Sequence, residues 1–469
     1  MLDLKLSGGT LVTESESFRA DIGIEGGKIA CIGLALPDSR QVIDAEGLFI
    51  LPGGVDAHCH IDEPPYGGAE LADDFTSASR AAACGGTTTI IPFVNQLAGR
   101  SLRQAVADYR EKARASLVDY AFHIILKKPG LAAALAELEA LLAEGYRSIK
   151  LFMTYPGYMM DDSDMLAVMH AVACGNGTVL VHAENGHCIQ FLSDQLASAG
   201  QTALSAHAEA APPAVEREAA HRAISLAEVA GCRLLIVHVS AGEALEQIEW
   251  AKRKGLRVLA ETCPQYLACA MTASDGKSWE DAKLLCSPPP RPAADRLRLW
   301  QGIAARSFDL LSSDHCPYRF DGARGKKVSG ASEPDFRTVP PGLPGIETRL
   351  PVFYEHAVAG GRLSINRFVA LTSANPARIY GLYPRKGSLM PGSDADLAVW
   401  DMKTPRKISH AALHDACDYT PYEGMYVSAW PVMTISRGSV IWAKGEVSDE
   451  FGRGRFLRQQ AHESCPIGR

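Results

Sequence analysis

The sequence lacks the features that mark export, membrane insertion and nucleic-acid binding. Its 469 residues contain no block of basic residues and no apolar run long enough to cross a bilayer, and the net charge is −7. Residues 1–30 show no signal-peptide pattern. The twelve cysteines include no C-x-x-C pair, and without an export signal we interpret them as reduced thiols. We therefore expect a soluble cytoplasmic protein whose partners include neither nucleic acid nor a membrane.

A dinucleotide-binding fingerprint is also missing, because no G-x-G-x-x-G opens a helix after the first predicted strand. Beyond Leu51, short apolar runs alternate with helical patterns, two of which, Ala132–Ala143 and Glu216–Ala230, are followed by a glycine. Eight strands separated by helices predict an α/β protein with a (β/α)8 TIM-like barrel. The predicted strands are Gly54–His58, Thr87–Val94, Tyr120–Leu126, Ser148–Met153, Thr178–His182, Arg233–Val239, Arg257–Thr262 and Asp309–Asp314.

Short alternating strands with glycine-rich breaks occupy both ends of the chain. They include L-D-L-K-L-S near the start, and D-L-A-V-W-D and P-V-M-T-I-S after residue 387. We predict that residues 1–50 and 388–451 form one small composite β-sandwich domain. Residues 51–387 would then form the barrel, and residues 452–469 a polar, irregular tail.

The stretch V-D-A-H-C-H at residues 55–60 ends one of the predicted strands. Side chains two residues apart leave the same face of a strand, so His58 and His60 should point the same way. Two imidazoles on one face provide half of a metal site. Two histidines near a turn are also often simply hydrogen-bonded to backbone, so the other strand ends decide between these interpretations.

Barrel enzymes carry their active sites at the carboxyl ends of the strands. The later predicted strands end near Lys150, His182 in V-H-A-E-N, His238 in V-H-V-S and Asp314 in S-S-D-H. One histidine at a strand end is usually structural, but four histidines and an aspartate at one rim favour a metal centre. Imidazole and carboxylate ligands suit Zn²⁺, with Mn²⁺, Co²⁺ or Fe²⁺ as alternatives.

Lys150 lies in the apolar strand S-I-K-L-F-M and allows two interpretations. A buried ammonium is costly unless it is paired, so an ion pair with a carboxylate is the simpler one. Alternatively, a lowered pKa would let the amine take up CO₂ and form an anionic carbamate that bridges two metal ions. A metal cluster at this rim favours the carbamate, because the cations would repel an ammonium.

Nine motifs together resemble the cyclic amidohydrolases of the amidohydrolase superfamily, most closely the dihydropyrimidinases and D-hydantoinases. The resemblance covers nearly the whole chain in order and implies a metal-dependent barrel that hydrolyses the ring amide of a cyclic ureide, a dihydropyrimidine or a hydantoin. The motifs are G-G-V-D-A-H-C-H, G-G-T-T-T-I-I-P-F, S-I-K-L-F-M-T-Y, V-H-A-E-N, E-T-C-P-Q-Y-L, C-S-P-P-P-R, S-S-D-H-C-P, P-G-I-E-T-R-L-P and K-G-S-L-M-P-G-S-D-A-D-L.

The same resemblance implies two divalent ions, Zn²⁺ or else Mn²⁺ or Co²⁺, that share a carboxylated lysine and activate a water. One ion would be held by His58, His60, Asp314 and the Lys150 carbamate (N6-carboxylysine), and the other by His182, His238 and the same carbamate. The resemblance also implies a homo-oligomer, a tetramer or a dimer.

Four further roles follow from the resemblance. Asp314 would carry the proton to the leaving ring nitrogen, and Tyr155 would donate to the developing oxyanion. Ser287 and the backbone at Pro341 and Gly342 would hold the imide edge of the ureide.

The sequence departs from the family pattern at two positions. Pro341 replaces the usual asparagine and lacks an N–H, and Glu63 stands where relatives commonly place an apolar residue. With Phe152, Tyr158 and Met159, the loop containing Glu63 should shape the pocket for the exocyclic substituent.

Several alternative functions remain open at this point. Allantoinase, dihydroorotase and imidase are rival activities, although a dihydroorotase needs a cationic site for a carboxylate that the sequence does not clearly provide. A catalytically silent scaffold relative would have lost metal ligands, whereas all six ligand positions are occupied here.

Overall fold

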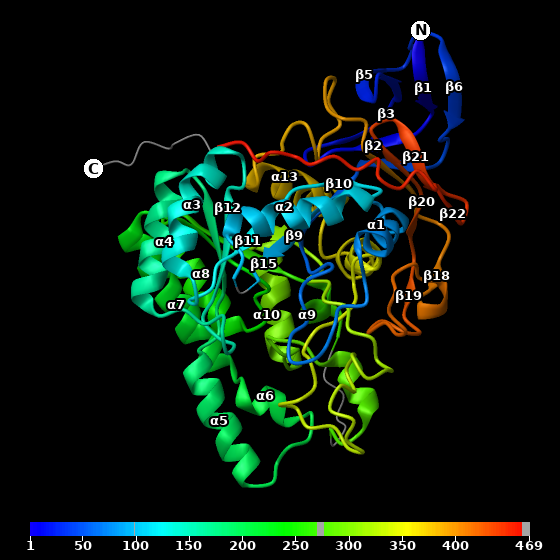
Figure 1. Ribbon diagram of the computed structural model, residues 1–469. Coiled ribbons are helices and arrows are strands. Elements are labelled where there is room, and N and C mark those ends of the chain that lie inside the picture. The colour runs from blue at the N-terminus through cyan, green and yellow to red at the C-terminus, as the bar shows by residue number, and fades with distance from the viewer. Residues whose placement is uncertain (98, 270–275, 462–469) are drawn as a thin grey trace.

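A nearly closed barrel of parallel strands forms the centre of the computed structural model, which describes residues 1–97, 99–269 and 276–461 (Figure 1). The strands run in the order β8, β9, β11, β12, β13, β14, β15, β16, with the short β10 also paired to β9. Their bounds are β8 (Gly54–Cys59), β9 (Thr87–Asn95), β10 (Asp119–Tyr120), β11 (His123–Ile125), β12 (Ser148–Phe152), β13 (Thr178–His182), β14 (Arg233–Ile236), β15 (Val258–Thr262) and β16 (Leu310–Leu311). The predicted barrel is confirmed.

The predicted third strand is interrupted rather than continuous. Asp119 pairs with Thr89 and His123 with Phe93, so β10 and β11 follow β9 in one register. Two other predicted strands are shorter than expected, since β14 ends at Ile236 and β16 at Leu311. The candidate ligands His238 and Asp314 therefore lie in the loops just beyond these strands.

Helices surround the barrel, and two have clear terminating signals. The helix α3 (Leu131–Ala143) is followed by Gly145 at φ 98°, and α7 (Pro213–Ala230) begins with a proline and ends at Gly231 at φ 66°. Both helical predictions are confirmed. The other α-helices are α1 (Phe75–Cys84), α2 (Leu102–Lys112), α4 (Asp162–Cys174), α5 (Gly186–Ser198), α6 (Ala206–Ala210), α8 (Gly242–Arg253), α9 (Pro264–Ala268), α10 (Ala293–Ala304), α11 (Arg349–Tyr354), α12 (Ile365–Val369) and α13 (Asn375–Ile379).

Short helical turns complete the barrel and its loops. Three are 3₁₀ turns, namely η1 (Ala113–Ala115), η2 (Trp279–Leu284) and η5 (His410–Ala412), and two are π-helical, namely η3 (Glu355–Ala359) and η4 (Ala370–Ala374). Within the part of the chain that the structure describes, no helix is both long and apolar enough to cross a bilayer.

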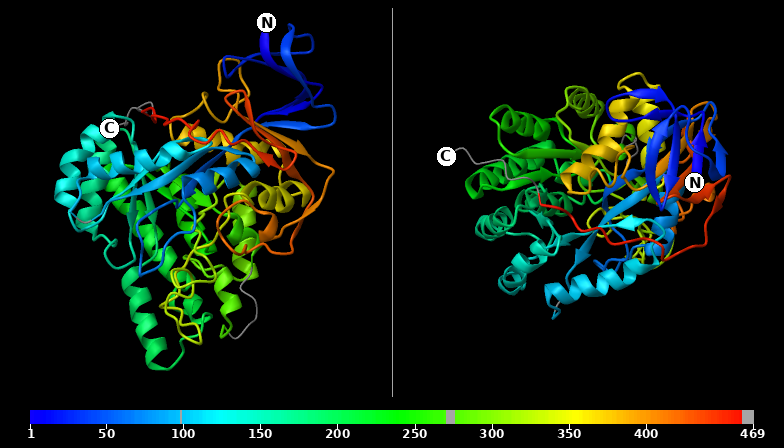
Figure 2. Two further views of the ribbon diagram at one scale, coloured as in Figure 1. Left: turned by 45° about the vertical axis from the view of Figure 1, so that its right-hand side comes forward. Right: turned by 90° about the horizontal axis from the view of Figure 1, so that it is seen from above.

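A separate sheet domain joins the two ends of the chain (Figure 2). Its seven-stranded sheet runs β22, β21, β20, β17, β7, β2, β3, and β7 pairs with the N-terminal β2 on one side and the C-terminal β17 on the other. The four-stranded sheet runs β5, β4, β1, β6. The N-terminal strands are β1 (Leu2–Ser7), β2 (Thr10–Val12), β3 (Ser17–Arg19), β4 (Asp21–Glu25), β5 (Lys28–Gly33), β6 (Ser39–Asp44) and β7 (Phe49–Pro52). The C-terminal ones are β17 (Leu397–Asp401), β18 (Arg406–Lys407), β19 (Tyr426–Val427), β20 (Trp430–Ser436), β21 (Ser439–Ala443) and β22 (Glu446–Val447).

The composite arrangement has a shared apolar core. Leu6 of β1, Leu11 of β2, Ile50 of β7 and Leu397 of β17 are fully buried in one cluster. Apolar side chains from both ends of the chain thus hold the two sheets together. The residue boundaries of the predicted domains stay a prediction.

The C-terminal tail is irregular, but it is not a loose polar end. Leu457 is fully buried among residues of the barrel interior, and its N–H donates to the carbonyl of Tyr120. Gln459 accepts the N–H of Arg147 just before β12. The tail therefore crosses the amino ends of the strands, opposite the candidate site. Residues 462–469, which belong to the predicted tail, lie outside the described residues.

Candidate functional site

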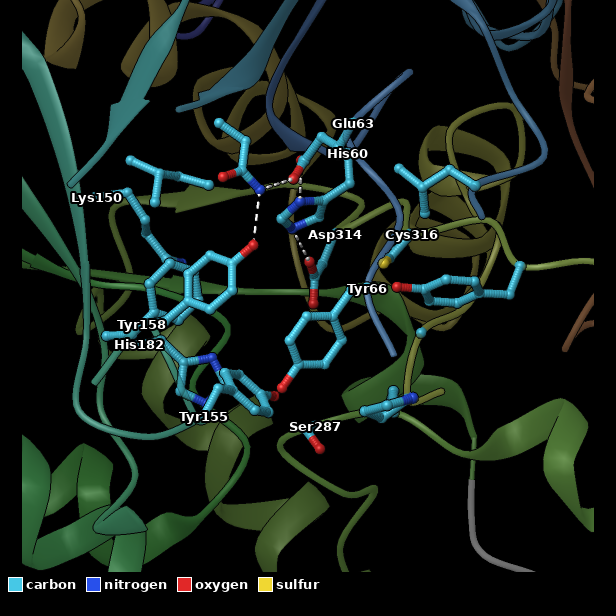
Figure 3. A pocket seen from close by; sticks show the side chains of 18 of the residues that line it. His60, Glu63, Tyr66, Lys150, Tyr155, Tyr158, His182, Ser287, Asp314 and Cys316 are labelled. Carbon is cyan, nitrogen blue, oxygen red and sulfur yellow. Dashed lines mark hydrogen bonds and ion pairs between the residues drawn. The ribbon is translucent and has the colours of Figure 1, made fainter. Parts of the chain in front are cut away.

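The six predicted ligand positions lie around one pocket at the carboxyl ends of the barrel strands (Figure 3). His58 and Lys150 belong to β8 and β12, and His182 is the last residue of β13. The remaining three follow β8, β14 and β16. All six line the pocket: His58, His60, Lys150, His182, His238 and Asp314.

His58, His60 and Asp314 form the tightest cluster. One ligand atom from each lies within 4.8 Å of the other two. A carboxylate oxygen of Asp314 lies 3.2 Å from Nε2 of His58 and 3.5 Å from Nε2 of His60. Two imidazole nitrogens and a carboxylate oxygen converging in this way form a ligand set that suits a divalent transition metal.

Carboxylates hold the far ring nitrogens of three of the four histidines. Nδ1 of His58 lies 2.6 Å from Glu261, and Nδ1 of His60 lies 2.6 Å from Glu63. Nε2 of His182 lies 2.6 Å from Glu184. A carboxylate on one nitrogen fixes the tautomer and leaves the other nitrogen free to bind a metal, which is the usual support of metal-binding histidines.

Three buried nitrogens at the centre have no hydrogen-bond partner within the described residues: Nε2 of His58, Nζ of Lys150 and Nδ1 of His238. Buried polar atoms are almost always satisfied, so three orphans in one pocket call for a group that binds them. Burial also lowers the pKa of His58 and of His238 well below the usual value, which keeps both rings in the neutral form that a metal requires. The residues present therefore fit a metal centre.

Lys150 is buried without an ion pair. The described residues place no carboxylate within ion-pair distance of Nζ, and the nearest aromatic neighbours are Phe93 and Phe152, whose ring centres lie 5.3 and 5.1 Å away. Burial lowers the pKa of Lys150 to about 8, against the opposing pull of Asp314 and Glu261. The simpler interpretation, in which Lys150 is ion-paired with a carboxylate, is therefore not supported, because no carboxylate among the described residues pairs with it.

Three residues of the pocket have left-handed backbone, which is uncommon outside glycine. They are Tyr155 at φ 70°, His238 at φ 39° and Asp314 at φ 49°. Such conformations cost about 1–3 kcal/mol each and concentrate at functional sites, where the surrounding structure enforces them.

The sequence profile of the amidohydrolase family matches residues 49–441, most of the chain. The chain belongs to this family. It is 40% identical to a D-hydantoinase of Ralstonia pickettii over 98% of this chain and 100% of that protein, and 38% identical to one of Rhizobium radiobacter over the same shares. A crystal structure of dihydropyrimidinase from Brevibacillus agri superposes with a TM-score of 0.94 at 37% identity, covering 99% of this chain and 100% of the other.

Beside the candidate metal centre of this amidohydrolase lie the four residues predicted to contact substrate: Tyr155, Ser287, Pro341 and Gly342. Burial raises the pKa of Tyr155 well above its usual value, so its hydroxyl keeps the proton needed for donation. The Ser287 hydroxyl lies 3.1 Å from Nε2 of His207. The Gly342 N–H donates to the Leu285 carbonyl at 3.0 Å, so neither Pro341 nor Gly342 offers a backbone donor to a ligand.

Aromatic side chains form one wall of the same pocket. Tyr66 packs edge-on against Tyr155 and Tyr158. Phe152 also packs edge-on against these last two rings. The prediction that Met159 belongs to this wall is wrong. Met159 lines a neighbouring hollow instead, because it is bridged to Phe152 and adjacent residues of an extended segment point to opposite sides.

Three polar residues of this amidohydrolase site were not predicted from the sequence: Glu184, Glu261 and Asn95. Glu184 stands two residues after His182, and Glu261 is the penultimate residue of β15, one of three predicted strands to which no site residue was assigned. The strand-end rule that identified the histidines would have identified Glu261. Asn95, at the end of β9, could have been found in the same way.

Proposed function

We propose that this chain is a metal-dependent cyclic amide hydrolase that opens the ring amide of a cyclic ureide. The substrate would be a 5,6-dihydropyrimidine or a 5-monosubstituted hydantoin, and the product the corresponding N-carbamoyl amino acid. The observation that carries the proposal is the convergence of six ligand-type side chains on one pocket, in a chain with full-length similarity to D-hydantoinases.

Two divalent ions, Zn²⁺ or else Mn²⁺ or Co²⁺, would occupy this centre. His58, His60 and Asp314 would hold one ion, His182 and His238 the other, and a carbamate on Lys150 would be shared by both. When bound, the ions supply a water whose pKa is lowered toward 7 and polarise the ring carbonyl.

Asp314 would accept the proton of the attacking water and deliver it to the leaving ring nitrogen. Its carboxylate faces both His58 and His60, so it lies at the metal centre and at the pocket at the same time. Tyr155 would donate its hydroxyl proton in a hydrogen bond to the oxyanion that develops on the ring carbonyl. The raised pKa of Tyr155 supports this role.

The imide edge of the ureide would face Ser287 and the backbone at Pro341 and Gly342. With the Gly342 N–H already donated and none on Pro341, this segment would act through carbonyl oxygens, which accept the ring N–H of a ureide.

The charge of the pocket weighs against a dihydroorotase. Among the described residues that line it, Lys150 is the only lysine or arginine, and the metal centre would use it. A substrate carboxylate would therefore lack a cationic partner. The six ligand-type residues weigh against a silent scaffold.

The test is turnover of a panel with purified protein before and after chelation. The panel contains dihydrouracil, dihydrothymine, hydantoin, 5-substituted hydantoins, allantoin, dihydroorotate and succinimide. We expect two ions per chain, hydrolysis of dihydrouracil or a 5-monosubstituted hydantoin, loss of activity on chelation, and recovery with Zn²⁺, Mn²⁺ or Co²⁺. Full activity in metal-free protein would overturn the proposal. Preferred turnover of allantoin or succinimide would show that the proposed substrate class, dihydropyrimidine or hydantoin, is wrong.

We also propose a cytoplasmic homo-oligomer, a tetramer or a dimer. Light scattering coupled to size-exclusion chromatography measures the mass of the assembly directly.

A further inference from the structure

Glu63 lies in the loop after β8 and is held between a candidate metal ligand and the pocket wall (Figure 3). One carboxylate oxygen lies 2.6 Å from Nδ1 of His60, and the other accepts the side-chain N–H of Asn95 at 3.1 Å. The Glu63 side chain is only 9% exposed. Both carboxylate oxygens are thus engaged within the protein.

The far side of the His60 ring faces Asp314. Nε2 of His60 lies 3.5 Å from the Asp314 carboxylate, and Figure 3 shows the imidazole between Glu63 and Asp314. A proton on Nδ1, donated to Glu63, leaves the lone pair of Nε2 directed at the metal centre. The opposite tautomer would place two acceptors against each other at 2.6 Å.

From this geometry we infer that Glu63 is a positioning residue for His60 and thereby sets the affinity of one of the two metal positions. The inference rests on the proposed two-metal function. The Glu63 carboxylate fixes the tautomer and the ring orientation of His60 and increases the basicity of Nε2, as carboxylates behind metal-bound histidines generally do.

Glu63 also links His60 to the wall of the pocket through hydrogen bonds. Asn95 donates to Glu63 and also to the Tyr158 hydroxyl at 2.8 Å, and Tyr158 lines the pocket beside Tyr66. Glu63 is held in place by Asn95, not by substrate. Each Glu63 oxygen already has one partner inside the protein, and these two contacts fix the carboxylate in the orientation that supports His60.

His60 belongs to only one of the two proposed ligand sets, so the effect should be selective. We expect Glu63→Met, which has similar size but no acceptor, to weaken one ion about 10- to 100-fold and leave the other unchanged. Glu63→Gln retains an acceptor without the charge and should weaken the same ion less. A merely structural role would not distinguish the two ions.

The experiment is stepwise chelator competition with elemental analysis of the metal retained per chain, together with the visible absorption of the Co²⁺-loaded protein. Glu70→Gln is the matched control, because Glu70 lies in the same loop but pairs with the exposed Arg324. Thermal melts identify any variant that fails to fold. If Glu63→Met is lost in this way, Glu63→Gln carries the test.

Two failures can be told apart. Wild-type protein that binds no metal and hydrolyses nothing would remove the proposed function itself. Wild-type protein that binds two ions, with folded Glu63 variants that bind both as tightly and show the same Co²⁺ spectrum, would overturn the role of Glu63 alone.

Discussion

The Asp314 backbone N–H donates to the His58 carbonyl oxygen at 2.9 Å, while the side chains of the same two residues meet at 3.2 Å. A second bond, from the His60 N–H to the His315 carbonyl at 2.7 Å, continues the contact. The first and last strands of the barrel thus close through the candidate ligands. The contacts that join these two strands therefore also bring the candidate ligands together.

Asp314→Asn should retain metal and lose turnover. The amide offers an oxygen of similar shape but cannot carry a proton, so we expect kcat to fall by about 10²- to 10⁴-fold. Steady-state kinetics and metal analysis measure the two effects separately. The exposed Asp321→Asn is the control. Near-normal turnover with both ions bound would reduce Asp314 to a structural ligand.

Lys150→Ala should bind metal poorly and be nearly inactive, because the shared anion is lost. Acetate or propionate should restore part of the activity by occupying the vacated space and bridging the ions. Alanine protein that keeps both ions and full turnover without added carboxylate would contradict the role of Lys150.

Intact-mass analysis of gently handled wild-type protein should show the mass of CO₂ on Lys150, and acidification should remove it. The unpaired, buried Nζ and a pKa lowered to about 8 make a free amine available near neutral pH, which is the form that reacts with CO₂. An unmodified lysine in metal-loaded protein would return the residue to a structural interpretation.

Pro341→Asn should leave the KM for dihydrouracil unchanged or lower it. The new N–H offers a hydrogen bond worth roughly 0.5–1.5 kcal/mol, provided that the loop can relax around it. A large rise in KM would show instead that the proline is a positive specificity feature and that the native substrate is not an unsubstituted ureide.

Lys386→Met should destabilise the protein by about 3–5 kcal/mol, because it leaves buried carboxylates without their cation. Lys386 is fully buried and lies 2.6 Å from both Asp119 at the barrel and Asp396 at the sheet domain. Burial opposes its charge, but Asp396, Asp119 and Asp394 outweigh burial and raise its pKa above the usual value.

The sign of that shift fixes the pH dependence. A raised lysine pKa means that the stabilisation is present at all pH values below about 10.4 and is lost only above the raised pKa. Denaturant melts of Lys386→Met should therefore show a loss of stability at pH 9 that is at least as large as the loss at pH 6, because the carboxylates left without a cation take up protons more readily at the lower pH. Lys28→Met is the matched control, since exposed Lys28 approaches Asp394 at 3.8 Å and should contribute at most about 1 kcal/mol.

The barrel and most of the site could be predicted because they depend on local rules. Strand parity placed His58 and His60 on one side, and the carboxyl ends of parallel strands meet at one rim, which brought Lys150, His182 and Asp314 together. These rules need only short stretches of sequence, and the motif order then identified the family.

The support of the site could not be predicted in the same way. The strand-end rule could have identified Glu261 as a residue of the site, but its contact with His58 joins residues 203 positions apart, and no local pattern predicts that pairing. Tyr158 lines the pocket and Met159 a neighbouring hollow, and the turn at Tyr155 that precedes them has a left-handed residue that the local sequence does not predict. Phe456 and Leu457 pack against the barrel but lie in an otherwise polar segment, so the composition of the tail gives no sign of these contacts.

The central position of β7 has a consequence for synthesis on the ribosome. Leu51 pairs with Ala398, about 350 residues later, which at about 5–20 residues per second leaves one edge of β7 open for roughly 20–70 s. An unpaired strand edge is a template for contact with other chains. Nascent chains should therefore aggregate most readily when they pause before β17 emerges, and slower translation of that last stretch should lower the yield of folded protein.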